Sequence, residues 1–155
     1  MDRYFTGKFE FSIDSKGRVS VPAKFRDLLD ADTNFHIIRV PKFSLRIYPE
    51  AEWEKKARIY ANLPETPEFH EYTRIFYNSQ ADSDLDPQGR ITIPKRQLEQ
   101  IKYNSGKLVF LGMGKYIEVF CAENENAKIE DDEDEKLFAE NYYKIEEKIR
   151  EFEEK

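Results

Sequence analysis

Hydrophobic and polar residues alternate in two widely separated stretches of the chain, which is the pattern of β-strands with one buried face. In the first stretch, apolar residues take every second position over residues 9–13 and again over residues 19–21. In the second stretch, the alternation returns over residues 91–93. A turn sequence precedes residues 19–21 and 91–93 alike. The pattern therefore predicts short strands arranged around two tight turns.

The two stretches are copies of one motif. Residues 14–22 read DSKGRVSVP and residues 86–94 read DPQGRITIP, with four identical positions and three exchanges of Val for Ile or Ser for Thr. The spacing of 72 residues holds without gaps from residues 5–48 to residues 77–120. Asp at the first position and Gly at the fourth are typical of a type I turn. The turn residues are Asp14 and Gly17 in the first copy and Asp86 and Gly89 in the second.

Each copy continues into a short helix and two further strands. Pro22 and Pro94 stand where the helices should begin, because proline is tolerated at the first helical position. Apolar runs then predict strands over residues 35–39, 45–48, 108–111 and 117–120. Between the copies, apolar residues from Trp53 onward recur at helical spacing, and Thr66-Pro67 has the form of an N-cap and a first helical position. The connecting segment is therefore predicted to be a helical hairpin.

Residues 122–155 form an acidic tail. Its five consecutive acidic residues at 131–135 are a type of block that is usually solvated and often disordered. Beyond the block, apolar residues step by four and three, a heptad pattern that predicts an amphipathic helix over residues 135–152. The residues of this stripe are Phe138, Tyr142, Ile145, Ile149 and Phe152. The helix could pack on its own subunit, on a neighbouring subunit or against another protein.

Composition and motifs argue against several classes of protein. The single cysteine, Cys121, rules out an intrachain disulfide and fits a reducing cytosol. No stretch approaches the ~18 apolar residues of a membrane helix, and the first residues lack an apolar signal segment. There is no phosphate-binding loop, dinucleotide turn or nucleophile elbow, and His36 and His70 have no partner motif. We therefore expect no enzyme, metal, cofactor, small-molecule substrate or membrane partner.

The turn motif places several cations on one side of each copy. Val19 and Val21 face the core, so Arg18 faces away from it, and Arg90 does the same in the second copy. The residues predicted to form a binding surface are Lys16, Arg18, Arg3, Lys8, Lys24, Arg26, Arg90, Lys95 and Arg96. The alternative is a solvated charged face, or an Arg18–Asp14 pair that braces the turn. The recurrence of Gly-Arg in the same context favours the binding surface.

The net charge of −6 at first argues against a nucleic-acid partner, because phosphate binding needs Lys and Arg. The tail, however, holds 6 Lys and Arg against 14 Asp and Glu, a net −8, which leaves +2 for residues 1–121. The acidity therefore belongs to the tail. We expect the tail to point away from the cationic surface or to screen it.

The motif Asp-x-x-Gly-Arg-(Val/Ile)-x-(Val/Ile)-Pro resembles the signature of the AbrB/SpoVT-type swapped-hairpin DNA-binding fold. Two copies in one chain, with the sequence EWE at residues 52–54 between them, resemble the bacterial MraZ family. Further matching features are Phe5-x-Gly7, Tyr48-Pro49 and Leu85-Asp86. The resemblance covers roughly residues 3–121.

The resemblance implies an α+β fold. It would be a tandem, pseudo-two-fold AbrB-like arrangement, a swapped-hairpin or double-psi-like small β-barrel with intervening and C-terminal helices. The expected segments are a first AbrB-like repeat at 1–49, a connecting helical hairpin at 50–76, a second AbrB-like repeat at 77–121, and an acidic tail with an amphipathic helix at 122–155.

The resemblance also implies a function. MraZ-like proteins are transcriptional regulators that bind repeated sites in double-stranded DNA, in the promoter of the division and cell-wall gene cluster. They assemble into closed homo-oligomeric rings, here expected to be an octamer or larger. Such a protein would be cytoplasmic and associated with the nucleoid.

The family's motif carries over to particular residues. Arg18 matches a key DNA contact, and Lys16, Lys24 and Arg26 match basic positions of the family's first motif. The second copy departs from this pattern, because Gln88 stands at the turn tip and Leu98 stands at the position of Arg26. We therefore expect the first copy to dominate DNA contact and Arg90 to be structural.

A second hypothesis keeps the fold and changes the partner. AbrB-type modules also occur in antitoxins, and the acidic tail could then cover a protein partner. Such modules usually carry one motif copy per chain, which counts against this alternative.

Overall fold

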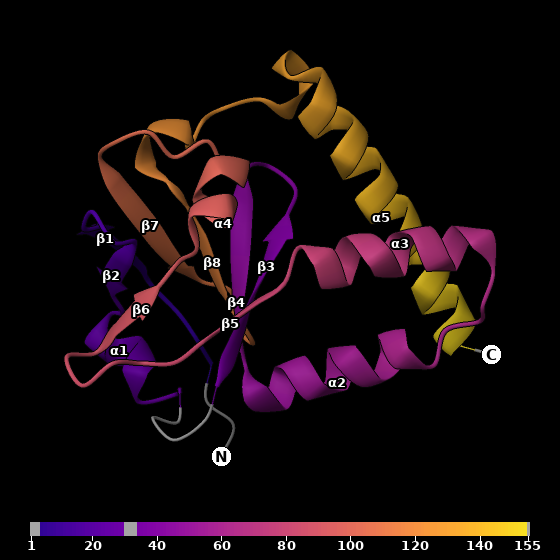
Figure 1. Ribbon diagram of the computed structural model, residues 1–155, viewed down its shortest axis with the longest axis horizontal. Coiled ribbons are helices and arrows are strands. Elements are labelled where there is room, and N and C mark those ends of the chain that lie inside the picture. The colour runs from indigo at the N-terminus through magenta and orange to yellow at the C-terminus, as the bar shows by residue number, and fades with distance from the viewer. Residues whose placement is uncertain (1–3, 30–33, 155) are drawn as a thin grey trace.

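The computed structural model describes residues 4–29 and 34–154 of the chain (Figure 1). It is an α+β protein with a mostly antiparallel sheet, as expected. The first copy comprises β1 (Lys8–Ser12), β2 (Arg18–Ser20), α1 (Ala23–Arg26), β3 (Phe35–Val40) and β4 (Ser44–Pro49). The second comprises β5 (Ala81–Ser83), β6 (Arg90–Thr92), α4 (Lys95–Gln100), β7 (Lys107–Gly112) and β8 (Ile117–Cys121). Element by element, the strands predicted from the repeat are confirmed.

The two copies exchange strands. Six strands form one antiparallel sheet in the order β1-β7-β8-β4-β3-β5, and β2 pairs with β6 in a separate two-stranded ribbon. The first copy's β1 thus lies against β7 of the second copy, while β5 of the second copy lies against β3 of the first. Neither copy can complete its sheet alone, so the two fold as one unit.

One hydrophobic core fills the space between the sheet and the ribbon. The alternating residues point inward from both layers, as a period of two requires. Fully buried members include Phe25, Phe35, Ile37, Leu45, Ile91, Leu108 and Phe110. Burial of each such side chain contributes about 1.5–3 kcal/mol. This core holds the ribbon, with its two turns, in a fixed place on one face of the sheet.

A second core lies on the opposite face of the sheet. There β3 and β4 pack on α2 (Glu50–Ala61) and α3 (Pro67–Asn78). The side chain of Thr66 accepts a hydrogen bond from the backbone N–H of Phe69, so the predicted N-cap is confirmed. Trp53 stacks on Phe76 with ring centroids 5.2 Å apart, and Tyr60 stacks on the same ring at 3.8 Å. These stacks join α2 to α3, and the stacking of Trp53 on His36 of β3, with ring centroids 4.6 Å apart, joins the hairpin to the sheet.

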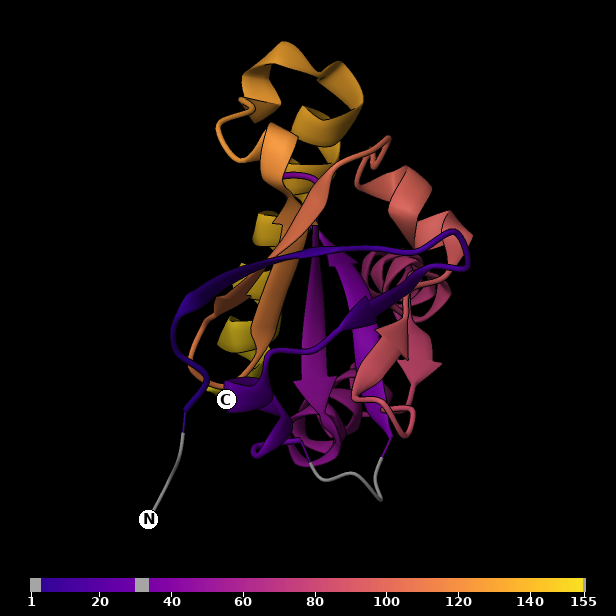
Figure 2. The same cartoon turned by 90° about the vertical axis from the view of Figure 1, so that its left-hand side faces the viewer.

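The tail ends in the long helix α5 (Glu133–Glu153), after two short 3₁₀ turns, η1 (Ala122–Asn124) and η2 (Ile129–Asp131). Its Ile149 is buried in the second core, and Glu146 accepts hydrogen bonds from the hydroxyls of Tyr60 (2.7 Å) and Tyr72 (3.0 Å). Of the three packing alternatives, the structure shows α5 packed on its own chain. Figures 1 and 2 show β2, β6 and α1 on one side of the molecule and α2, α3 and α5 on the other.

The expectation of a solvated, disordered acidic block at 131–135 is wrong for two of its five residues, Asp132 and Glu135, which make specific contacts at the start of α5. Asp132 caps α5 by accepting the backbone N–H of Glu135 at 2.9 Å. The Glu135 side chain is only 2% exposed, where it accepts both terminal nitrogens of Arg39 and the backbone N–H of Phe43. Carboxylates near a helix N-terminus are favoured by the helix dipole, and Arg39 compensates the buried charge. The block therefore anchors the tail.

A membrane-spanning helix and a metal cluster are both absent from the described residues. Within the described residues, no helix combines the length and apolar character needed to cross a membrane. Among the same residues, no cluster of His, Cys, Asp and Glu has the arrangement to hold a metal ion. Cys121 is buried and free.

Candidate nucleic-acid interface

The first turn is built around the carboxylate of Asp14. Its Oδ1 accepts the backbone N–H groups of Lys16 (2.9 Å) and Arg18 (2.8 Å), and its Oδ2 accepts Nε of Arg18 at 2.7 Å. The hydrogen bond from the backbone of Arg18 is the main cause that lowers the pKa of Asp14, and its side chain adds to the effect. Gly17 closes the turn at φ +80°, a conformation that only glycine adopts without strain. The turn thereby fixes the position of the Arg18 backbone, from which the side chain projects.

The second turn repeats this arrangement almost atom for atom. Asp86 accepts the backbone N–H groups of Gln88 and Arg90, each at 2.9 Å, and Nε of Arg90 at 2.8 Å. The pKa of Asp86 is lowered, again chiefly by the backbone of Arg90. Gly89 has φ +76°. The four identical motif positions therefore specify one backbone framework twice.

The ribbon places the two turns at its opposite ends, because β2 and β6 are antiparallel and each turn precedes its own strand. Val19 lies opposite Ile91 on its buried face, so both motif arginines point to the other face. The backbone N–H of Val21 donates to the carbonyl of Gly89 at 3.0 Å, and that of Ile93 donates to Gly17 at 2.8 Å. Each copy thus closes the turn of the other.

Of the two interpretations of Arg18, the structure shows the pair with Asp14, and the role in a binding surface stays a prediction. The pairing with Asp14 that would brace the turn is present, but it uses only Nε and the backbone. The two terminal nitrogens of Arg18 make no hydrogen bond to another described residue, and the side chain is 35% exposed. Arg90 is 28% exposed and also approaches Asp14, with Nη1 4.0 Å from Oδ2. Arg90 thus approaches both turns, whereas the terminal nitrogens of Arg18 have no hydrogen-bond partner in the described part of the chain.

Several of the other predicted cations gather around this ribbon. Lys16 is exposed at the first turn tip, and it shares with Lys95 a surface hollow of about 430 Å³ that Tyr103 also lines. Lys24 and Arg26 are exposed on α1. Arg96 donates to the carbonyl of Gln80 at 3.3 Å, beside β5.

Two predicted residues do not join this group. Lys8 lies at the start of β1, at the far end of that strand from the turn, and pairs with Glu125 at 2.5 Å. That hydrogen bond is the main cause that raises the pKa of Lys8. Arg3 lies outside the described residues.

Comparisons with known proteins bear on this geometry. The family model described as "MraZ protein, putative antitoxin-like" matches residues 4–79. A "Transcriptional regulator MraZ" of Polaromonas sp. is 37% identical over 120 residues, covering 76% of this chain and 82% of the relative. Relatives of the same name from Pediococcus pentosaceus and Lachnoclostridium phytofermentans are 33% and 35% identical over 131 residues, covering 84% of this chain and 90% and 91% of their own lengths. The chain belongs to the MraZ family.

Within this MraZ-family chain, the two copies are not equivalent on the exposed face of the ribbon. The turn tip carries Lys16 in the first copy and Gln88 in the second. The short helix carries Arg26 in the first copy and Leu98 in the second. The framework is therefore symmetric, but the cations on it differ: the first copy has Lys16, Arg18, Lys24 and Arg26, and the second has Arg90, Lys95 and Arg96.

Sequence reasoning about this MraZ-family chain missed the contact between Arg39 and Glu135. The one available signal was a cation inside the otherwise apolar strand β3, whose sequence is FHIIRV. A charged side chain in such a strand needs a buried partner, and that partner lies 96 residues away. Local pattern could predict the need for a partner but not its identity.

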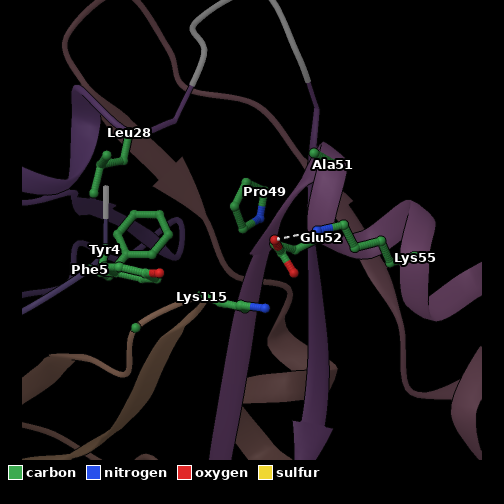
Figure 3. A pocket seen from close by; sticks show the side chains of 9 residues that line it. Tyr4, Phe5, Leu28, Pro49, Ala51, Glu52, Lys55 and Lys115 are labelled. Carbon is green, nitrogen blue, oxygen red and sulfur yellow. Dashed lines mark hydrogen bonds and ion pairs between the residues drawn. The ribbon is translucent and has the colours of Figure 1, made fainter. Parts of the chain in front are cut away.

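A separate pocket of about 320 Å³ lies away from the ribbon, where the first described residues meet the start of α2 (Figure 3). Its lining residues are Tyr4, Phe5, Leu28, Pro49, Ala51, Glu52, Lys55, Gly114 and Lys115. The charged groups there include Lys55 and Glu52, which pair at 3.2 Å. Its described lining residues include no histidine, cysteine or hydroxyl nucleophile beside a base. Of the predicted DNA-contacting residues that the structure describes, none lines this pocket.

Proposed function

We propose that the chain is a sequence-specific DNA-binding transcriptional regulator and that the exposed face of the β2–β6 ribbon is its DNA-contacting surface. The observation that carries this proposal is Arg18: its backbone and Nε are fixed by Asp14, while its terminal nitrogens make no hydrogen bond to another residue that the structure describes. The names of the relatives, which call them transcriptional regulators, support the same role.

The chemistry of the surface suits DNA. Arginine can donate two hydrogen bonds to O6 and N7 of guanine, and a two-stranded ribbon fits the major groove. Lysine contacts phosphate mainly as a point charge, a role that suits the exposed turn-tip residue Lys16. Because the anchored tail helix lies on the opposite face of the sheet, its negative charge is kept away from this surface.

The finer form of the proposal concerns assembly and target. The exchange of strands between the copies supports an AbrB-like swapped-hairpin barrel, divided at the boundaries predicted from the repeat. We propose that several copies form a closed ring that engages repeated DNA sites before the division and cell-wall genes. One module would bind weakly, whereas linked modules gain through effective concentration when the site spacing lets them bind together.

The antitoxin-like alternative has less support. In that hypothesis the tail covers a protein partner, yet the apolar stripe of α5 already packs on α2 and α3 through Ile149 and Tyr142. The helix would have to leave its own chain to bind a partner through that stripe. Pull-down with and without residues 122–155 tests this point, because a small protein captured only with the tail would favour the alternative.

Selection from a random duplex pool tests the main proposal. We expect a recovered sequence whose affinity falls about 5- to 150-fold in Arg18→Ala, since one good bidentate base contact is worth about 1–3 kcal/mol. Lys144→Ala, which removes an exposed cation from α5, is the matched control and should leave affinity within about twofold. Failure to recover any sequence, or equal affinity of the two variants, contradicts the proposal.

A further inference from the structure

The side chain of Arg26 occupies the space above the turn of the other copy. A Cβ atom built on Gly89 would lie 2.5 Å from Nη1 of Arg26, 2.9 Å from its Cδ and 3.1 Å from its Cζ. Real Cβ atoms essentially never show contacts below 3.0 Å, so the Arg26 side chain lies in space that is open only because residue 89 is glycine. Gly89 itself is buried, while Arg26 stays exposed on its outer side.

The equivalent place above the first turn is filled differently. A Cβ on Gly17 would lie 2.6 Å from the backbone carbonyl oxygen of Ile93, and Leu98 stands 3.9 Å away. Leu98 is the repeat counterpart of Arg26. In both copies, the turn is therefore contacted by residues of the other copy, but only the turn at Gly89 is covered by a cation.

We propose that the Gly89 turn is a seat that positions Arg26 on the DNA-contacting surface, so that the second copy acts on DNA through an arginine of the first. This inference rests on the proposed function. It also explains why the second copy keeps the turn framework although Gln88 has replaced the tip lysine. Gly89 is a positioning residue, and Arg26 is the contact.

The physical gain comes from order in the free protein. A free arginine side chain carries about 2 kcal/mol of rotamer entropy, much of which is lost when it binds. Holding the side chain in place beforehand reduces that loss and strengthens binding. Glycine at position 89 serves two purposes, because it adopts φ +76° and leaves room for the guanidinium.

The chain offers a matched control for the backbone effect. Gly106 also has a positive φ, +90°, but nothing lies within 4 Å of a Cβ built there. Gly89→Ala and Gly106→Ala therefore share the strain of alanine in this conformation, and only the first collides with Arg26. Any loss of DNA affinity in Gly89→Ala beyond the loss in Gly106→Ala therefore measures the contribution of the contact between Gly89 and Arg26.

The experiment measures binding of a short mixed-sequence duplex, labelled with fluorescein, over a series of salt concentrations. We expect Gly89→Ala to weaken binding and to lower the slope of log K against log salt by about one unit, the loss of one phosphate contact. Arg26→Ala should give the same loss without touching the turn. Gly89→Ala should add little in the Arg26→Ala background, because the two changes act on one contact.

A readout without DNA separates this inference from the proposed function. In the free protein, ¹⁵N relaxation of the Arg26 Nε–Hε group should show a restrained side chain, and Gly89→Ala should release it while Gly106→Ala does not. A mobile Arg26 in the unaltered protein overturns the seat. Equal affinity losses for Gly89→Ala with and without Arg26 also overturn it. Absence of DNA binding by the unaltered protein, with Arg26 restrained, overturns the proposed function instead and leaves a seat with no role in DNA binding.

Discussion

The turn at residues 14–17 and the turn at residues 86–89 have the same hydrogen bonds and present different side chains. In each, an aspartate accepts two backbone N–H groups and the Nε of the motif arginine. What differs is the tip, Lys16 or Gln88, and the residue laid over the partner turn, Arg26 or Leu98. The comparison teaches that the identical positions of the repeat specify the backbone of the turn. The variable positions determine which side chains each turn presents.

The hairpin loops of the two copies differ in a similar way. The β3–β4 loop holds Lys42 and Phe43 at φ +70° and +52°, which costs about 1–2 kcal/mol for each non-glycine residue. The β7–β8 loop has Gly114 at φ +84° in the position that corresponds to Lys42. Glu135 accepts the N–H of Phe43 in the first loop, whereas Phe5 exchanges backbone hydrogen bonds with Gly114 in the second. The first copy therefore depends on the tail.

The largest expected effect comes from a substitution that removes the contact between the tail and the first loop. Glu135→Ala should lower the free energy of unfolding by about 3–5 kcal/mol, because it leaves the largely buried Arg39 without its charged partner. Urea unfolding measures this loss. Hydrogen exchange should show the Phe43 N–H losing protection while the Gly114 N–H keeps it.

The exposed neighbour Glu133 supplies the control for this change. Glu133→Ala should alter the free energy of unfolding by no more than about 0.5 kcal/mol. A Glu135→Ala loss of similar size would mean that the tail does not support the first copy, and the contrast between the loops would fail.

A smaller expected effect tests whether the two turns, which have the same hydrogen bonds, also contribute equally to the pH dependence of stability. The folded-state pKa of Asp14 and that of Asp86 both lie below the ordinary value of an aspartate, chiefly because each carboxylate accepts the backbone N–H of its motif arginine. A carboxylate with a lowered pKa stabilises the folded state above its unfolded pKa, and this contribution disappears as pH falls through the folded value. Stability should therefore fall below about pH 4.

Thermal unfolding of Asp14→Asn and Asp86→Asn across that pH range measures the two contributions separately. Each variant should lose part of the acid dependence while its asparagine still accepts the turn N–H groups. The two losses should be of similar size. A loss confined to one variant would show that the frameworks are unequal.

The sequence supported the prediction of local structure and of exposure. Alternation identified the inward residues such as Val19 and Ile91, and Asp-x-x-Gly identified both turns. It could not show that β1 pairs with β7, because alternation determines which face is buried but not which strand lies alongside. The contact of Arg26 with Gly89 also crosses between copies, so no local pattern could reveal it.

The acidic block of the tail also shows that a local pattern cannot predict contacts with distant residues. Five adjacent acidic residues predict a solvated run, because like charges repel and favour water. Asp132 and Glu135 depart from that pattern through a helix cap and a distant arginine. The roles of Lys16, Arg18 and the other cations in DNA contact stay predictions.

The central claim is that DNA contact is concentrated in the first copy, and matched triple variants test it most directly. The first variant changes Lys16, Arg18 and Arg26 to alanine, and the second changes Arg90, Lys95 and Arg96. The slope of log K against log salt for a mixed-sequence duplex should fall by about two to three units in the first variant, at roughly 0.9 per phosphate contact, and by clearly less in the second. Equal reductions in the two variants would contradict the claim.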